Sequence, residues 1–321
     1  MKAVWECAKC YPHYYMVIER RQVTTQEHEH DSHGHSGGHG HGGGHGNGPY
    51  DPSDLVRADA FYGGVYQEIA DWLNISPGTK ALEAGSGAGG FTELLARAVG
   101  PEGTVAALDV TPELLQTAKE TVEKSPHKDR ASYHEGDIGR LPFEDGTFDL
   151  VWSSRTVHHL ADQLAGVKEL RRVLKPGGRL ALREGGLRSR FLPIDSGVGQ
   201  PGLEDRLDVA FEAWFHTHVR GGEGVLAYPF GWTQLLRDAG LGRVTAKSFM
   251  LEVLPPLQPV QVEFMTNLLR RWVESDQRRG FISQADAETI VALIDTESAQ
   301  YAFKRQDLHY MEGVTVYLGK A

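Results

Sequence analysis

The chain has 321 residues, of which 40% are hydrophobic and 24% charged, and a formal charge of −10 at pH 7. It is long enough for one large or two modest domains with an ample core. The acidic balance argues against nonspecific binding of nucleic acid or anionic membranes as its main role. No run approaches the roughly 20 apolar residues of a membrane span, and the first residues lack a signal peptide's apolar segment, so we expect a cytoplasmic protein.

The N-terminal tail, residues 1–48, differs in composition from the rest of the chain. It holds eight of the fifteen histidines, and nine of the fifteen residues from Gly34 to Gly48 are glycine. Such a sequence buries too little apolar surface to offset the entropy lost on ordering, so we predict that residues 24–48 are disordered. We expect the globular domain to span residues 49–321.

The tail also carries the only two cysteines of the sequence, Cys7 and Cys10, with His13 close behind them. A Cys-x-x-Cys pair in histidine-rich surroundings supplies ligands that suit zinc or nickel. Cys7, Cys10 and His13 are therefore candidate metal ligands. A flexible tail with incidental metal affinity is the alternative, because the sequence has no second cysteine pair.

The globular part begins with apolar residues at helical spacing over residues 54–73. We expect Gly63-Gly64 to weaken or break this helix, because glycine is a poor helix former. A short apolar strand follows at residues 79–84, and a further helix is predicted from Thr92. Between the strand and that helix lies a loop rich in glycine.

This glycine-rich loop, Gly85-Ser86-Gly87-Ala88-Gly89-Gly90, is the centre of the predicted site. Glycines let a backbone turn tightly or lie against a ligand, and the amides of the next helix N-terminus face the same place. A nucleotide or nucleoside-like ligand suits that environment. The spacing Gly85-x-Gly87-x-x-Gly90 also fits the dinucleotide fingerprint of dehydrogenases, so the loop alone leaves both classes open.

Strands and helices alternate after the loop at spacings suited to parallel crossover units. A Thr111-Pro112-Glu113 sequence predicts one helix start, and further strands are expected at residues 104–108, 131–135, 148–152 and 179–183. Ligands of such sheets bind outside the carboxyl ends of the strands. The candidate site residues at those ends are Glu83, Gly85, Asp109, Asp137, residues 153–159 and Glu184.

Beyond the fifth strand the simple alternation stops. We predict a loop over 187–202, helices over 203–218, 230–239, 258–278 and 284–303, and strands over 243–253 and 314–318. Two helical insertions, about 187–230 and 254–310, are expected to cover the carboxyl edge of the sheet as a substrate lid. Extra core or a dimer surface is the alternative role.

An ordered set of motifs resembles the class I S-adenosylmethionine-dependent methyltransferases, within them the UbiE-like small-molecule branch. The set comprises Leu82-Glu83-Ala84-Gly85-Ser86-Gly87-Ala88-Gly89, Asp109, Gly136-Asp137, Phe148-Asp149-Leu150-Val151 and Arg172-Val173-Leu174-Lys175-Pro176-Gly177-Gly178. The resemblance covers roughly residues 60–185. It implies an α/β, Rossmann-like, seven-stranded sheet, with five parallel βα units, a final hairpin-like pair and helical lid insertions after strand 5 and between strands 6 and 7.

The resemblance also implies roles for the strand-end residues. The methionine end of S-adenosylmethionine is expected at Glu83 and the glycine loop, the ribose at Asp109 and the adenine at Asp137. The full set of implied cofactor residues is Glu83, Gly85, Ser86, Gly87, Gly89, Asp109, Val110, Asp137, Ile138 and Ser154. A dehydrogenase has no reason for the Lys175–Gly178 turn or the Gly136-Asp137 turn, so the methyltransferase interpretation is favoured.

Methyl transfer needs a base only when the acceptor atom carries a proton. His158 and His159 are the leading candidates, because imidazole titrates near neutral pH, and Glu184 is a further candidate. Arg155, Arg183, Trp214 and His218 are candidate substrate contacts. We expect a small-molecule acceptor, no nucleic-acid or membrane partner, and a monomer or homodimer. A catalytically inactive, methyltransferase-like binding protein with a metal-binding tail is the alternative.

Overall fold

Helix α1 (Pro52–Leu73) opens the part of the chain that the computed structural model describes, residues 51–321. The predictions for Cys7, Cys10, His13 and the histidine tract lie outside the described residues. Pro52 occupies the first turn of α1, and the side chain of Asp51 accepts a hydrogen bond from the Ser53 amide.

The expectation that α1 breaks at Gly63-Gly64 is wrong, since the helix continues without interruption to Leu73. Both glycines are exposed, and a Cβ at either position would meet nothing within 4 Å. The opposite face of α1 is buried in the core. Tertiary packing of that face outweighs the unfavourable helix propensity of the two glycines, which is about 1 kcal/mol per residue.

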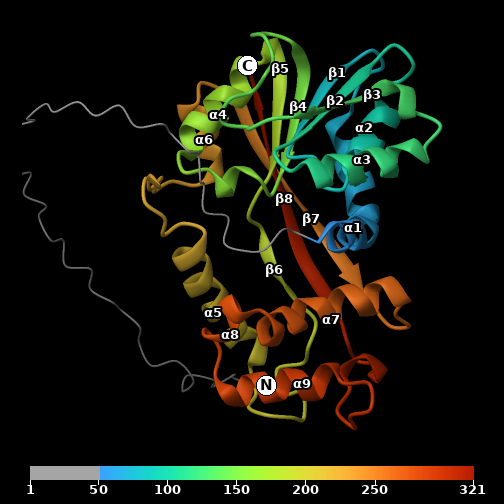
Figure 1. Cartoon of the computed structure of the whole chain (residues 1–321), viewed down its shortest axis with the longest axis vertical. Coiled ribbons are helices and arrows are strands. Elements are labelled where there is room, and N and C mark those ends of the chain that lie inside the picture. The colour runs from blue at the N-terminus through green and yellow to red at the C-terminus, as the bar shows by residue number, and fades with distance from the viewer. Residues whose placement is uncertain (1–50) are drawn as a thin grey trace, which may run out of the picture. The chain divides into compact units, whose positions relative to one another are not determined.

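The central sheet has eight strands in the order β3-β2-β1-β4-β5-β8-β6, with β7 pairing to β8 (Figure 1). Strands β1 to β5 pair in parallel, and β8 runs antiparallel to β5, β6 and β7. The strands are β1 (Lys80–Ala84), β2 (Thr104–Asp109), β3 (Ala131–Glu135), β4 (Phe148–Ser154), β5 (Leu174–Arg183), β6 (Leu187–Arg190), β7 (Gly242–Val253) and β8 (Tyr310–Lys320).

The α/β, Rossmann-like architecture is thus confirmed, with one strand more than the seven expected. The additional strand is β6, in a segment predicted to be a loop. Gly186 has φ +111°, and a Cβ there would lie 2.1 Å from the Gly313 carbonyl oxygen. Glycine therefore lets the chain after β5 pass close to β8 and pair with it.

Helices cover both faces of the sheet. Along β1, Ala81 joins the core cluster that α1 and α2 cover, whereas Leu82 joins the cluster that α4 and α6 cover. This alternation follows from the two-residue period of a strand. The helices are α2 (Gly90–Ala98), α3 (Pro112–Glu123), α4 (Gln163–Arg172), α5 (Leu203–His218), α6 (Trp232–Asp238), α7 (Pro259–Glu274), α8 (Asp276–Arg279) and α9 (Gln284–Ile294), with single 3₁₀ turns at Lys128–Arg130, Val157–His159 and Ala302–Lys304.

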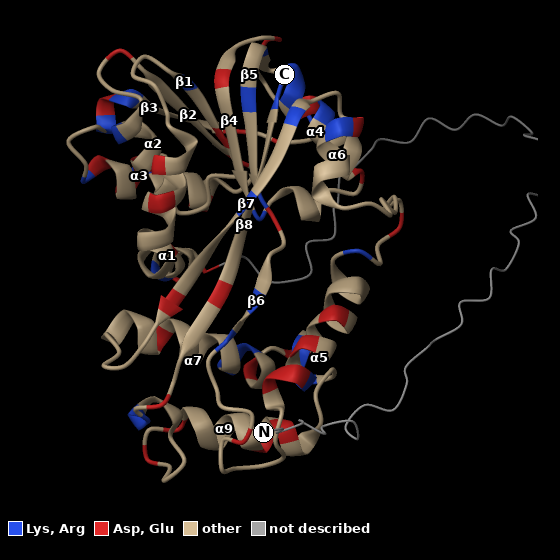
Figure 2. Cartoon of the chain, turned by 180° about the vertical axis from the view of Figure 1, so that it is seen from behind, with Lys and Arg blue, Asp and Glu red and all other residues tan. Residues whose placement is uncertain are grey.

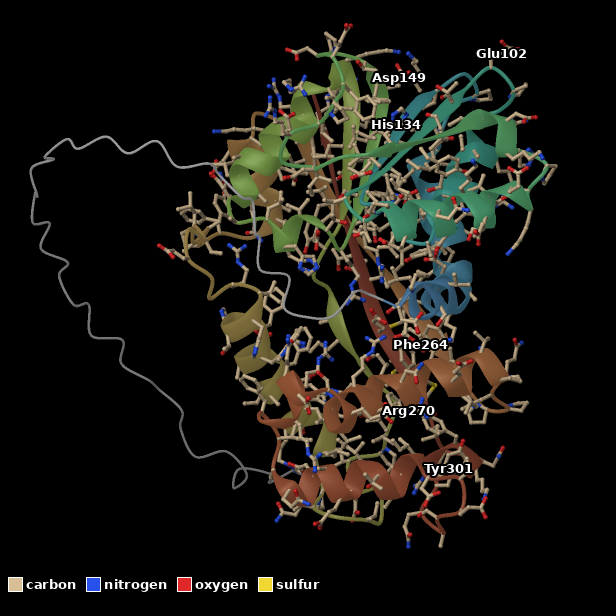
Figure 3. The ribbon with its side chains drawn as sticks, viewed as in Figure 1. Glu102, His134, Asp149, Phe264, Arg270 and Tyr301 are labelled. Carbon is tan, nitrogen blue, oxygen red and sulfur yellow. The ribbon has the colours of Figure 1, made fainter. Side chains whose placement is uncertain are left out.

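Helices α5, α7, α8 and α9 lie toward the carboxyl ends of the parallel strands. Asp149 marks the opposite, amino end of β4 in Figure 3, far from the labelled Phe264 on α7. The rings of Phe61 on α1 and Phe264 stack with centroids 4.0 Å apart. The second insertion therefore shares one apolar core with α1 and with the lower parts of β7 and β8.

The surface of the insertion helices mixes both signs of charge, as Figure 2 shows for α5. Arg190 at the end of β6 pairs with Asp205 and Asp208 on that helix, each at 2.7 Å. These contacts fasten β6 to α5. In the part of the chain that the structure describes, no helix is long and apolar enough to cross a membrane.

Candidate active site

The glycine-rich loop is fixed to the neighbouring strand by backbone hydrogen bonds. The amides of Gly85 and Ser86 both donate to the Leu108 carbonyl oxygen, at 2.8 and 2.9 Å. Gly85 has φ +83°, and a Cβ there would lie 2.3 Å from Oγ1 of Thr156. The loop therefore packs directly against the segment that follows β4, and only glycine permits this approach.

Asp109 ends β2 beside this loop and is 8% exposed. Its Oδ2 accepts a hydrogen bond from the Gly87 amide at 2.9 Å, and its Oδ1 accepts one from the Thr111 amide at 3.0 Å. The predicted helix start at Thr111 is confirmed, but the Thr111 side chain forms no cap. A carboxylate at this edge is thus held in place by two backbone amides.

Apolar side chains stand beside the polar strand ends. Val110 is 54% exposed although it directly follows the buried Asp109. After β3, Asp137 is exposed and its Oδ1 accepts a hydrogen bond from the Gly139 amide at 2.7 Å, while Ile138 is buried. An accessible apolar side chain next to carboxylates suits a ligand with one flat apolar face and polar edges.

Glu83 lies almost fully buried in β1, 2% exposed, and accepts a hydrogen bond from the Thr92 hydroxyl. Burial raises the pKa of the Glu83 carboxyl well above its ordinary value, and the nearby Asp59 and Asp109 carboxylates add to this rise. The Thr92 hydrogen bond opposes it. A buried acid of this kind is favourable only if a positive or hydrogen-bonding group approaches it.

Asp59 on α1 lies against the glycine-rich loop of the candidate site and was not predicted from the sequence. Its Oδ2 accepts a hydrogen bond from the Gly90 amide at 2.9 Å. Burial raises its pKa to about 6, against the opposing effects of the Gly90 amide and of Arg183. A signal was present in the sequence, because Leu55, Asp59 and Tyr62 follow helical spacing, which puts one acid on an otherwise apolar face.

His158 and Glu184 form a hydrogen-bonded pair across the ends of β4 and β5. Nδ1 of His158 lies 2.7 Å from Oε2 of Glu184, which is 1% exposed. Oε1 of Glu184 accepts the amides of Thr156 and Val157, at 2.9 and 2.8 Å. Glu184 therefore holds both the backbone of this segment and the orientation of the imidazole, and a carboxylate acceptor favours a proton on Nδ1.

The His158 ring also lies near two other rings. His159 is exposed, and its ring centroid is 4.1 Å from that of His158. Phe215 on α5 lies 5.7 Å from His158 and was not predicted. Trp214 and His218 on the same helix, which were predicted, pack instead against α8 and against Phe281, two residues beyond it. The Trp214 ring lies 4.2 Å from the Arg278 guanidinium, and the His218 ring lies 5.6 Å from that of Phe281.

Arg183, at the end of β5, is 4% exposed. Its Nη1 donates to the Tyr66 hydroxyl at 3.2 Å and to the Ser154 Oγ at 3.3 Å, and its Nη2 lies 4.0 Å from Glu312. The structure thus brings Arg183 and Ser154 together inside the protein. Arg155 is exposed and adopts φ +53°, an uncommon backbone conformation for a side chain of this size.

The residues present fit a nucleoside-type ligand with a polar tail. The Oγ of Ser86 in the glycine loop is buried and has no hydrogen-bond partner within the described residues. Gly87 combines φ +53° with open space, since a Cβ would meet only Leu55 at 3.7 Å. Among residues 51–321, no group of three or more histidine, cysteine, aspartate or glutamate side chains is arranged to hold a metal ion.

The sheet is that of a Rossmann-like α/β domain, and the candidate site lies at its carboxyl edge, where ligands of such sheets bind. Residues 82–182 match the family model described as a methyltransferase domain. This match supports the resemblance of this part of the chain to class I S-adenosylmethionine-dependent methyltransferases, which the motifs indicated.

Curated relatives align with about a third of the chain. An uncharacterized 37.1 kDa protein in transposon TN4556 of Streptomyces fradiae is 40% identical over 116 residues, which is 36% of this chain and 33% of that protein. The demethylmenaquinone methyltransferase of Staphylococcus aureus is 38% identical over 112 residues, 35% of this chain and 45% of that enzyme. The aligned part spans less than half the length of either relative.

Solved structures show a more distant likeness. A SAM-dependent methyltransferase from Aquifex aeolicus is 19% identical with a TM-score of 0.41, and covers 83% of this chain and 99% of its own. The phosphoethanolamine N-methyltransferase 2 of Haemonchus contortus, in complex with S-adenosyl-L-methionine, is 18% identical with a TM-score of 0.48. It covers 84% of this chain and 57% of its own.

Proposed function

We propose that the protein transfers a methyl group from S-adenosylmethionine to a small-molecule acceptor at the carboxyl edge of its sheet. The observation that carries this proposal is the contact between the glycine loop and the His158 segment. The side chain of Thr156 packs directly against Gly85, where no Cβ would fit. Because Thr156 lies two residues before His158, the proposed cofactor loop and the candidate base are neighbours. The family match over residues 82–182 supports the same activity.

The residues that would hold the cofactor follow from the chemistry of the site. Asp109 is a carboxylate suited to the ribose hydroxyls, and Val110 with Ile138 supplies apolar contact for the adenine ring. Glu83 and the glycine loop would hold the methionine end. When bound, S-adenosylmethionine supplies a methyl group on a positively charged sulfur, so its transfer needs an aligned nucleophile and the exclusion of water.

His158 is proposed as the base for an acceptor whose reacting atom carries a proton. With Nδ1 donating to Glu184, the free Nε2 is able to accept a proton from a hydroxyl or an acidic carbon. Glu184 then acts as a positioning residue, because its two oxygens are engaged with the imidazole and with backbone amides. His159 and Phe215 border the same imidazole.

The proposal predicts a preference among acceptors. The Staphylococcus aureus relative is named demethylmenaquinone methyltransferase, and the reduced form of a quinone is an aromatic ring with ionisable hydroxyl groups. We propose that this protein accepts that chemical class. The test is a transfer assay with labelled S-adenosylmethionine and three acceptors: a hydroxylated naphthalene, a phenol and a primary amine. Transfer to the amine alone would contradict the proposed class, and cofactor binding without transfer would favour the inactive alternative.

We also propose that the tail binds zinc or nickel through Cys7, Cys10 and His13, on the strength of the residue types alone. A competition titration of the full chain against a chromogenic chelator tests this, with a Cys7→Ser/Cys10→Ser variant as the comparison. Equal metal affinity of the two proteins would contradict it. The cytoplasmic location and the state of monomer or homodimer stay predictions from the sequence.

A further inference from the structure

Asp59 on helix α1 lies against the glycine loop with one carboxylate oxygen engaged. A Cβ on Gly90 would lie 2.5 Å from Cγ of Asp59, so the two residues are in close contact. Oδ2 accepts the Gly90 amide at 2.9 Å, whereas Oδ1 accepts no hydrogen bond from the described part of the chain. One oxygen fastens α1 to the start of α2, and the other is left for a different partner.

Asp59 and Glu83 are neighbouring acids, and the one opposite charge that acts on Asp59 within residues 51–321 is that of Arg183. The charge of Asp59 contributes to the raised pKa of Glu83, and burial raises the pKa of Asp59 itself to about 6. Arg183 stabilises the ionised form of Asp59 only through its field, since its guanidinium is engaged with Tyr66 and Ser154. Buried carboxylates without a counter-charge are unfavourable, so a cation is stabilised at this position.

A second observation points to a ligand at the same loop. Ser86 is 6% exposed, and its hydroxyl has no hydrogen-bond partner within the described residues. Buried hydroxyl groups are nearly always hydrogen-bonded in folded proteins. The same loop therefore offers an unused donor and acceptor at Ser86 and a contact with the Asp59 carboxylate at Gly90. Together they suit a ligand that carries both an ammonium and a carboxylate group.

We propose that Asp59 binds the α-ammonium group of the cofactor's amino-acid end. This inference rests on the proposed function and adds a binding residue from α1, outside the 82–182 match. The ammonium group would donate to the free Oδ1 of Asp59 and offset the negative charge of that carboxylate. The hydroxyl of Ser86 is available to the cofactor's carboxylate. Because Oδ2 keeps its bond to Gly90, binding needs no loss of the contact between α1 and α2.

The test compares two ligands that differ in the amino-acid end. S-adenosylhomocysteine has the ammonium group, whereas 5′-methylthioadenosine shares the adenosine and thioether but lacks the amino acid. Asp59→Asn keeps the shape and an acceptor for the Gly90 amide while removing the charge. By calorimetric titration of the full chain, we expect this variant to bind S-adenosylhomocysteine about 10- to 100-fold more weakly and 5′-methylthioadenosine less than about twofold more weakly.

A matched control is Asp71→Asn, an exposed acid on the same helix that bonds Gln67, and it should change neither affinity. An equal loss for both ligands in Asp59→Asn, or no loss for either, would overturn the inference and leave the proposed function intact. If Asp59→Asn does not fold, wild-type protein is titrated with S-adenosylhomocysteine and its desamino analogue, where equal affinities overturn the inference. Wild-type protein that binds none of these ligands would instead refute the proposed function.

Discussion

Nδ1 of His158 lies 2.7 Å from Oε2 of Glu184, a carboxylate that is 1% exposed although it stands 26 residues further along the chain. The pair joins the ends of two adjacent parallel strands, β4 and β5. It gives the imidazole a fixed orientation at the edge where the glycine loop also lies. This fixed orientation suits the base proposed at His158 and is the reason for the first prediction.

Replacing His158 by alanine should lower kcat by about 100- to 10,000-fold for an acceptor with an ionisable hydroxyl group. The affinity for S-adenosylhomocysteine should stay unchanged, because the side chain lies outside the glycine loop. Steady-state kinetics and calorimetry measure the two quantities. A variant with normal kcat would remove His158 from the mechanism.

Glu184→Gln separates the orientation of His158 from the support of the backbone. The glutamine oxygen still accepts the amides of Thr156 and Val157, but its amide group donates to Nδ1 and favours the tautomer with the proton on Nε2. We expect kcat to fall about 10- to 100-fold, as for other partners that orient a histidine, with KM and stability nearly unchanged. A loss of stability without a change in kcat would show that Glu184 is only structural.

Gly85→Ala should weaken both folding and cofactor binding. The new Cβ would lie 2.3 Å from Oγ1 of Thr156, and the alanine backbone would have to adopt φ +83°. The control is Gly78→Ala, which has the same φ of +83° but nothing within 4 Å. We expect a loss of about 1 kcal/mol in the free energy of unfolding for the control, and about 1–3 kcal/mol more for Gly85→Ala.

Urea denaturation measures both glycine variants, and Thr156→Ala in the Gly85→Ala background should recover part of the difference, because it removes the nearest clashing atoms. Equal losses for Gly78→Ala and Gly85→Ala would mean that only backbone strain is involved. In that case the close contact between the loop and the His158 segment would contribute nothing to the difference in the free energy of unfolding.

The stacked pair of Phe61 and Phe264 predicts that the second insertion contributes to the stability of the whole domain. Phe264 is 6% exposed, so Phe264→Ala should lower the free energy of unfolding by about 3–5 kcal/mol. Phe230→Ala, at a position that is 62% exposed, is the matched control and should cost less than about 0.5 kcal/mol. Similar small losses for both would indicate that the insertion unfolds independently of α1.

Glu204 gives the protein a predicted pH dependence of stability. It accepts the amides of Phe191 and Leu192, at 3.0 and 3.1 Å, and burial raises its pKa from 4.5 to about 7. Because the folded protein holds this proton more tightly than the unfolded chain, the stabilising contribution is complete below pH 4.5. It is lost as the pH rises to about 7.

The wild-type protein should therefore lose about 2–3 kcal/mol relative to Glu204→Gln between pH 4.5 and 7, with no further relative change above that. Urea denaturation of both proteins across this range measures the difference. A difference that does not vary with pH would show that Glu204 is ionised with an ordinary pKa in the folded protein.

The strand-end residues were predictable because their signals are local. Short apolar runs in the sequence locate β1 and β2. The acids Glu83 and Asp109 lie at the carboxyl ends of those runs, which marks them as candidates. The uninterrupted α1 was not predictable from Gly63-Gly64, because the energy that holds it comes from packing against α7 and the sheet. Local propensity carries no information about such distant partners.

The missed site residues depend in the same way on contacts between distant segments. Asp59 stands 31 residues before its hydrogen-bond partner Gly90, so only its place on an apolar helix face marked it. The Phe215 ring on α5 lies near the His158 ring, which follows β4, although the two residues are far apart in the sequence. Glu184 was predicted as a candidate base, and its contacts with three groups of the preceding segment support the positioning role proposed above.

The central claim is that the carboxyl edge of the sheet binds an S-adenosyl cofactor. A calorimetric titration of the full chain with S-adenosylhomocysteine tests it most directly, with Asp109→Ala as the comparison. We expect saturable binding to one site in the wild-type protein, and an affinity about 10-fold or more lower in the variant, because the carboxylate for the ribose is lost. No detectable binding by the wild-type protein at about 1 mM ligand, equivalent to a binding free energy weaker than about −4 kcal/mol, would contradict the claim.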